Sequence, residues 1–328
     1  MSATLGLNVG TLFFYPLSPQ PDSREEAEVS EISEHLIVHE TPAVELEHLI
    51  IAYGGWPDAA ESATNTVKYL LRQLGAKKFA EIDPEEFFVF TQERPRSSRT
   101  SDGRRRIHWP TNEFHYWALE GKGPARGVMF LLGTEPNLRW RTFSSIVASV
   151  ARQYKVKTAI HVGALLDAVP HTRRTRLTGS STRPELQQAL DSASIGSSNY
   201  QGPTGISTAV MDACTRQGVG YASLWGHTAH YLQAAPNYRV SYTLAQSLVS
   251  LLDLPVDLSE LRTAADTFDA EVVKAVSADD QISDYVGKLE ERYDESVTSS
   301  EMPDPADVVR ELEQFLRSER GRGLGDNP

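Results

Sequence analysis

The sequence lacks the features that mark secreted and membrane proteins. Its 328 residues include a single cysteine, Cys214, so no disulfide can form within the chain, as is usual for proteins of the reducing cytoplasm. No apolar run is long enough to span a membrane, and the first residues have neither the basic start nor the apolar segment of a signal peptide. We therefore expect a cytoplasmic protein without a membrane partner, in which Cys214 is a core thiol rather than a nucleophile.

Motifs of the common enzyme chemistries are also missing. The sequence contains no G-x-S-x-G motif, no P-loop and no G-x-G-x-x-G after a predicted strand. His227 and His230 are three residues apart, but no nearby acid or third histidine completes a metal site. A proline interrupts the run that carries His108, Glu113 and His115. We expect no metal and no cofactor.

Acidic residues outnumber basic ones by 44 to 32, and the acidic excess is unevenly placed. The net charge is -12, and the segment from Asp257 to the end holds 19 acidic and 8 basic residues, which gives -11. The preceding residues hold 25 acidic and 24 basic residues and are nearly neutral. This distribution argues against a general attraction to nucleic acid or anionic lipid.

The pattern of the chain predicts three parts. Residues 1–35 are expected to be a flexible N-terminal segment, because residues 16–34 are rich in proline, serine and acids. Residues 36–256 form the expected α/β domain, and residues 257–328 form an acidic helical extension. In the extension, apolar residues recur at steps of three and four, which is typical of amphipathic helices. The extension is interpreted as a cap on the domain or as a contact for another protein.

Apolar runs alternate with helical patterns in the central part. Predicted buried strands lie at residues 48–53, 127–133, 156–163 and 220–226. Predicted helices lie at residues 58–75, 140–154, 203–218 and 240–253. Short aromatic runs at 86–91, 105–109 and 114–120 predict an antiparallel excursion. Together these patterns predict an α/β fold with a mainly parallel or mixed sheet covered by helices on both faces.

Polar residues gather in loops that follow four predicted strands. Crevices of open α/β sheets form outside the carboxyl ends of the strands, so we expect these loops to line one cleft. The candidate cleft or ligand-binding residues are Gly54, Trp56, Asp58, Asn112, Glu113, Gly133, Glu135, Arg139, Gly163, Asp167, His171, Arg173 and His227. Asp167 and His171 could act as a base and an acid, or Asp167 could be a capping acid at the end of a loop.

An arginine-rich stretch surrounds a turn signal. Six arginines fall between residues 94 and 106, and Asp102-Gly103 lies between two β-like runs. We interpret this as a hairpin with arginines near its tip. The arginines would be solvated and meet acids such as Glu85, Glu86 or the acidic tail, or they would bind an anion or RNA. The following "WPTNEF" is expected to fix a bend beside the cleft, and whether Asn112 or Glu113 also touches a ligand is left open.

Seven motifs in order resemble the PAC2 family, the bacterial relatives of proteasome assembly chaperone 2. They are "GGWPDA", "EIDPEEFFVFTQERP", "DGRRRIHWPTNEF", "LLGTEPNLRWRTF", "VGALLDAVPHTR", "YQGPTGI" and "SLWGHTAHY". The resemblance covers roughly residues 36–293. It implies a phosphorylase/hydrolase-like α/β fold with a C-terminal helical extension. Relatives in this family look like chaperones that hold proteasome subunits during ring assembly. The chain ends in "GLGDNP", without the hydrophobic-tyrosine-any-residue tail of some proteasome-binding relatives, so docking by that route is not expected.

Two hypotheses of function follow from these observations. The first is a non-enzymatic interaction or assembly protein that associates with itself as a homo-oligomer. Other proteins are further candidate partners, and the link to the proteasome rests on the resemblance. The second is an enzyme or sensor for a small anionic ligand, nucleoside- or phosphate-like, held by Arg139 or Arg173 in the cleft. Neither nucleic acid nor a membrane is expected as a partner.

Overall fold

The computed structural model describes residues 34–119, 126–198, 200–232 and 235–299. The expected flexible segment, residues 1–35, lies almost wholly outside the described residues, and so does the end of the acidic extension from residue 300. Within the described residues, no helix is both long enough and apolar enough to cross a bilayer.

Four parallel strands form the centre of an eight-stranded sheet. They lie side by side in the order β7 (Arg126–Thr134), β2 (Glu45–Gly54), β8 (Thr158–Asp167) and β10 (Gly220–Ala229). The near-continuous apolar runs predicted these strands, because a parallel sheet is buried on both faces. Their carboxyl ends lie at one edge of the sheet, where the candidate loops were expected.

Antiparallel strands complete the sheet on both sides. β6 (Asn112–Leu119), β3 (Lys77–Ile82) and β1 (Leu36–Val38) follow β7 outward, and β9 (Leu177–Ser181) pairs with β10. The mixed α/β fold and the antiparallel excursion predicted from the sequence are therefore confirmed. The aromatic run at 86–91 was predicted to be a strand, and that prediction is wrong. It forms turns that place Phe87 and Phe88 in the core.

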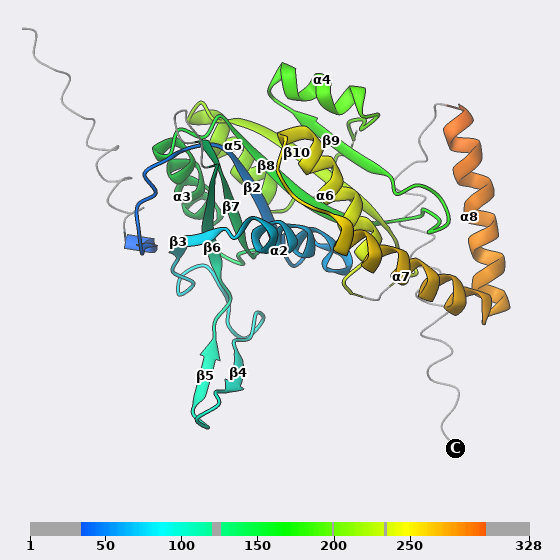
Figure 1. The fold of residues 1–328 in the computed structure, drawn as a ribbon, viewed down its shortest axis with the longest axis horizontal. Coiled ribbons are helices and arrows are strands. Elements are labelled where there is room, and N and C mark those ends of the chain that lie inside the picture. The colour runs from blue at the N-terminus through cyan, green and yellow to red at the C-terminus, as the bar shows by residue number, and fades with distance from the viewer. Residues whose placement is uncertain (1–33, 120–125, 199, 233–234, 300–328) are drawn as a thin grey trace, which may run out of the picture.

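Helices cover both faces of the sheet (Figure 1). Alternate residues of β2 point to opposite faces, so Ile51 and Tyr53 pack with one helical layer while Ile50 and Ala52 pack with the other. The first layer contains α3 (Trp140–Gln153) and α5 (Ile206–Arg216). The second contains α2 (Ser62–Leu74), α4 (Pro184–Ser192) and α6 (Tyr238–Leu252), and the short helix η1 (Ala59–Glu61) precedes α2.

The acidic extension begins with two helices. α7 (Ser259–Ser277) packs beside α6 through Leu261 and Ala245, and α8 (Asp280–Ser299) follows after a short turn. Apolar residues at steps of three and four predicted both helices, and they bury Phe268, Val272 and Leu289. Figure 1 shows α8 in orange at one side of the molecule, beside the connection that follows β8.

A two-stranded arm projects from the body of the protein. β4 (Arg96–Arg99) and β5 (Arg105–His108) form a separate two-stranded sheet, and the turn between them contains Gly103 with a φ of 81°. Glycine adopts this left-handed conformation without steric cost, which explains the Asp-Gly turn signal. Figure 1 shows the arm extending away from the sheet and the helices.

Candidate functional site

The candidate residues divide into two groups along the carboxyl edge of the parallel strands. The first group surrounds Glu135 and Asp58, in the loops after β7 and β2. The second surrounds Asp167 and His227, at the ends of β8 and β10, and is approached by α8.

Glu135 lies at the N-terminus of α5. The amide of Ile206 donates to its Oε1 at 2.8 Å, and the amide of Trp56 donates a second bond to the carboxylate. Burial raises the pKa of Glu135, and the two amide donors partly offset this effect. The backbone amide of Glu135 also donates to the carbonyl of Gly54 at 2.9 Å. The first turn of α5 is a place where an anion would bind, and the chain's own carboxylate already occupies it.

Asp58 holds the loop after β2 against the start of α2. It is buried, and its Oδ1 accepts from the amides of Ala63 at 2.7 Å and Thr64 at 3.1 Å, while the Thr64 hydroxyl donates to Oδ2. Burial raises the pKa of Asp58, although these hydrogen bonds act in the opposite direction. Asp58 also forms a parallel bridge with Ala164 of β8. The Asp58 carboxylate is thus bound by groups of the chain itself, and it holds the loop after β2 in place.

Gly163 makes room for an aromatic ring. A Cβ at this position would lie 2.5 Å from two ring atoms of Trp225, so a side chain larger than hydrogen does not fit. The same ring contacts His161, with centroids 5.2 Å apart, and His161 stacks on Tyr53. Burial lowers the pKa of His161 to about 3, so the ring is neutral near pH 7. The sequence interpretation did not include His161 and Trp225, although their alternate spacing with Gly163 and His227 placed them on one face of the two strands.

Asn112 and Glu113 lie on opposite faces of β6. Asn112 is buried above Gly133, where an added Cβ would lie 2.0 Å from its Oδ1. Among the described residues, its side-chain oxygen and nitrogen have no hydrogen-bond partner. Glu113 instead accepts from Lys78 Nζ at 2.8 Å and lies 3.2 Å from His115 Nε2. The two residues therefore face different surroundings.

The Arg139 side chain contacts residues of the segment between β3 and β4, and it also contacts His35. It forms an ion pair with Glu86, lies 3.3 Å from the His35 ring nitrogen and stacks over Phe87 at 6.0 Å. Its backbone is left-handed, with a φ of 51°, directly before α3 begins. The guanidinium thus fastens the loop after β7 to the loop after β3.

Asp167, His227 and Thr178 form a hydrogen-bonded row in the second group. His227 Nδ1 lies 2.6 Å from Asp167 Oδ2, and its Nε2 lies 3.0 Å from Thr178 Oγ1. Burial raises the pKa of Asp167, but His227 and other partners outweigh this effect and hold it below its usual value. A carboxylate, an imidazole and a hydroxyl in this order can move a proton.

The space around this row is small. Thr178 is 6% exposed, and the cavity that His227 lines measures about 30 Å³, which is room for one or two water molecules. A substrate cannot reach the Thr178 hydroxyl in this arrangement. The row therefore fixes the end of β8 against β9 and β10.

Arg173 connects the β8–β9 connection to α8. Its Nε and Nη2 bind the two oxygens of Asp294 at 2.9 and 2.8 Å, and its Nη1 lies 3.3 Å from Glu290. Asp294 raises the pKa of Arg173. This two-pronged contact is the geometry in which arginine binds carboxylates most strongly. Sequence reasoning missed Asp294, because an exposed acid on a distant helix carries no signal of its partner.

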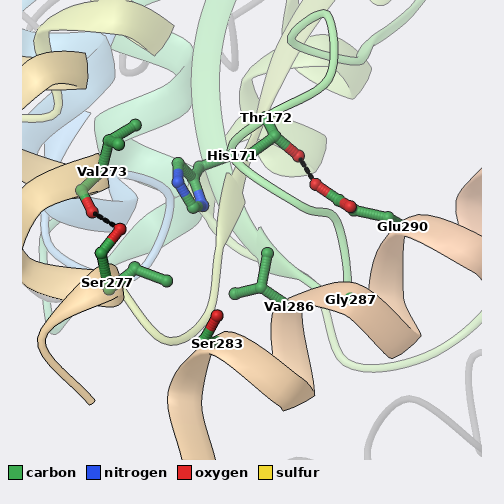
Figure 2. Close-up of a pocket in the computed structure, with 9 residues that line it drawn as sticks. His171, Thr172, Val273, Ser277, Ser283, Val286, Gly287 and Glu290 are labelled. Atoms are coloured by element: carbon green, nitrogen blue, oxygen red, sulfur yellow. Dashed lines mark hydrogen bonds between the residues drawn. The ribbon is translucent and has the colours of Figure 1, made fainter. Parts of the chain in front are cut away.

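His171 lies in the same area and lines a groove. Its backbone amide donates to the Tyr231 hydroxyl at 2.8 Å, and its Nδ1 lies 2.7 Å from that oxygen. Burial lowers the pKa of His171. The groove measures about 310 Å³ and lies between α7, α8 and the residues after β8 (Figure 2). Figure 2 shows Val273, Val286 and the His171 ring on its walls.

The two arginines that were expected to hold an anion are thus bound by carboxylates of this chain, and a carboxylate also occupies the start of α5. Arg139 binds Glu86, Arg173 binds Asp294 and Glu290, and Glu135 fills the start of α5. Within the described ranges, no group of three or more His, Cys, Asp or Glu residues is placed to hold a metal ion. These charged side chains bind one another and join loops and helices, and we call them the closed polar framework. This geometry differs from that of an open catalytic cleft.

Comparisons with known proteins agree with the fold. Residues 52–276 match the model of the PAC2 family. A PAC2 family protein from Streptomyces avermitilis is 31% identical, covering 73% of this chain and 99% of its own, with a TM-score of 0.66. A proteasome-assembly chaperone homologue of Mycobacterium tuberculosis is 28% identical, with coverage of 73% and 99% and a TM-score of 0.64.

A more distant structure shares the fold. PbaB of Pyrococcus furiosus, an archaeal proteasome activator, is 18% identical, covering 74% of this chain and 98% of its own, with a TM-score of 0.59. The comparison with curated proteins found no match.

Proposed function

The chain belongs to the PAC2 family, and from this premise we propose that it is a non-enzymatic, assembly-chaperone-like protein that works as a homo-oligomer. The observation that carries the proposal is the similarity to a proteasome-assembly chaperone homologue over almost the whole of that chain. Its partners are other proteins, with proteasome subunits as the first candidates. The cytoplasm, expected from the single cysteine, is part of this proposal.

The closed polar framework supports a role without catalysis. An enzyme needs an open pocket in which a substrate meets a nucleophile, a base or a set of charge-stabilising groups. Here Thr178 is buried beside His227, and Arg173 and Arg139 are neutralised by carboxylates of the same chain. These interactions hold loops and helices together, which suits a protein that presents rigid surfaces.

A second candidate is an enzyme or sensor for a small nucleoside- or phosphate-like ligand. Asp167, His227 and Thr178 form a row that can move a proton, although a ligand could reach it only after the surrounding residues move. Thermal-shift measurements with nucleosides, nucleotides and phosphosugars test it, because a ligand at a hundredfold excess over its Kd stabilises the folded protein by about 2.7 kcal/mol. We expect no shift from any of them. A saturable shift that disappears in His227→Gln would favour this second candidate.

Affinity purification tests the principal proposal. The tagged full chain is expressed in cells of its own source organism, crosslinked before lysis, and compared with cells that express the tag alone. We expect enrichment of proteasome subunits or their assembly intermediates. Recovery of the chain without an enriched protein partner, with and without crosslinking, would contradict the proposal.

A further inference from the structure

We propose that the β4–β5 arm of one copy docks on the groove between α7 and α8 of a second copy. The arginines of the arm would meet the acidic side of α8, and Ile107 would meet the valines of the groove. This inference rests on the proposed homo-oligomer and names the two surfaces that would build it.

Within the described ranges, most of the arm's arginines have no acidic partner in this chain. All eight residues of β4 and β5 are exposed, including Ile107 at 56%. In the described part of the chain, the ion pair made by the arginines of the arm joins Arg104 to Asp102, which lies in the same turn. The expected intrachain acid Glu86 binds Arg139 instead. The arm arginines therefore remain available to another molecule.

The pairing register makes the isolated arm unfavourable. Arg99 lies directly opposite Arg105, and like charges in this position destabilise a strand pair. A two-stranded ribbon without a covering layer is marginally stable in water. Arg99, Arg105 and Ile107 share one face of the ribbon, because Ser97 opposite Ile107 lies two residues from Arg99. An acidic surface with an apolar centre would stabilise that face.

The groove between α7 and α8 has these properties. Val273, Val276 and Val286 line it, and Val273 is 50% exposed. Its volume of about 310 Å³ suits a few side chains rather than a folded segment. Figure 2 shows that the groove opens between the two helices.

Acidic residues border this groove on α8. Residues three and four apart lie on one side of a helix, so Asp280, Asp284 and Glu291 form a stripe with Gly287, which lines the groove. Asp280, Asp284 and Glu291 are exposed. They differ from Glu290 and Asp294, which bind Arg173.

The charges of the two surfaces are opposite. Residues 94–108 contain six arginines and one aspartate, which gives +5, and residues 259–299 contain 11 acidic and 4 basic residues, which gives -7. Figure 1 shows the arm and α8 at separate sides of the molecule, so an arm does not reach the groove of its own copy. A contact between two different surfaces of identical chains forms a ring when the rotation closes.

A second copy fits the arm better than a nucleic acid does. The chain as a whole carries a charge of -12, which repels a polyanion. Trp109, the aromatic residue next to the arm, already contacts Phe90 with ring centroids 4.8 Å apart, and it is 45% exposed.

Paired charge reversals test the docking. The arm variant R99E/R105E keeps two like charges opposite each other, so it reverses the charge of this pair without adding repulsion between the two positions. The groove variant D284K/E291K changes exposed residues of α8. Light scattering after size exclusion measures the mass of each full-length protein against the monomer of 36.3 kDa.

We expect the wild type to form an oligomer and each paired variant to associate about 10- to 100-fold more weakly, because like charges now meet in the contact. The fourfold variant should recover the wild-type mass, since its glutamates meet its lysines. Rising salt should weaken the wild-type oligomer. Circular dichroism spectra, unchanged in the variants, separate lost association from lost folding.

The other outcomes are distinguishable. A wild-type oligomer unaffected by both paired variants, or a fourfold variant that stays dissociated, would overturn the arm contact and leave the proposed function standing. A monomeric wild type would overturn both the arm contact and the homo-oligomer. Arm-dependent binding of a single-stranded oligonucleotide, with oligomer mass unchanged, would assign the arm to nucleic acid instead.

Discussion

Glu113 is predicted to stabilise the fold in a pH-dependent manner. His115 and Lys78 hold the pKa of Glu113 down at about 2, compared with 4.5 for an unperturbed glutamate. A folded-state pKa below the unfolded one stabilises the protein above the unfolded value, and this stability is lost as the pH falls through the folded value. The relevant window therefore runs from about pH 5 down to about pH 2.

The magnitude follows from the size of the pKa shift. The shift from 4.5 to about 2 corresponds to at most about 3.4 kcal/mol at about 1.36 kcal/mol per unit. The Glu113 side chain is 29% exposed, so water screens the interaction. We expect Glu113→Gln to lower the free energy of unfolding by about 1–2 kcal/mol at pH 7. Below about pH 4.5 the carboxylate takes up a proton in the unfolded state but stays ionised in the folded state, so the difference should fall below about half near pH 3.

Urea unfolding of the wild type and Glu113→Gln at several pH values measures this difference. Glu93→Gln is the matched control, because Glu93 is an exposed glutamate of the loop before the arm and its replacement should change stability by less than about 0.5 kcal/mol. A Glu113→Gln effect equal at pH 7 and pH 3.5, or no larger than that of the control, would refute the assigned pKa and its cause.

Three further predictions concern packing, α8 and the single thiol. Gly163→Ala should destabilise the fold by about 1–3 kcal/mol, because its Cβ would lie 2.5 Å from the Trp225 ring. Gly196→Ala is the control, since nothing lies within 4 Å of the atom added there, and equal Tm values of the two variants would contradict the prediction. Arg173→Gln should increase hydrogen exchange along α8 without changing exchange in β2, since it removes the contacts to Asp294 and Glu290; unchanged protection of α8 would show that these contacts do not hold it. Cys214 is buried, and burial raises its pKa to about 12. A thiol reagent should therefore react slowly with the native protein and fully after denaturation. Rapid labelling of the native protein would disprove the place of Cys214 in the core.

The fold was largely predictable because its central strands are buried on both faces. Continuous apolar runs identify such strands, and the three- and four-residue spacing of Leu261, Ala265, Phe268 and Val272 identifies α7. The run at 86–91 was misassigned because aromatic residues favour strands and cores alike. Phe87 and Phe88 are buried, but turns rather than a strand carry them.

The arrangement of the candidate site was less predictable. The strand order explains why the loops share an edge, but sequence spacing does not say which side chains are already bound. Arg173 is paired with Asp294, more than a hundred residues later in the chain. Arg139 binds Glu86 from a loop that had been predicted to be a strand. Such partners depend on tertiary packing, so a charged residue at a strand end can be a structural anchor.

In vitro assembly of proteasome subunits tests the central proposal most directly. Purified α and β subunits of the source organism are mixed with and without the chain, and native electrophoresis follows the conversion of free subunits into rings. We predict faster or more complete ring formation with the chain, and a complex of the chain with assembly intermediates. Unchanged kinetics and no such complex, with a folded and oligomeric chain, would contradict an assembly-chaperone-like function.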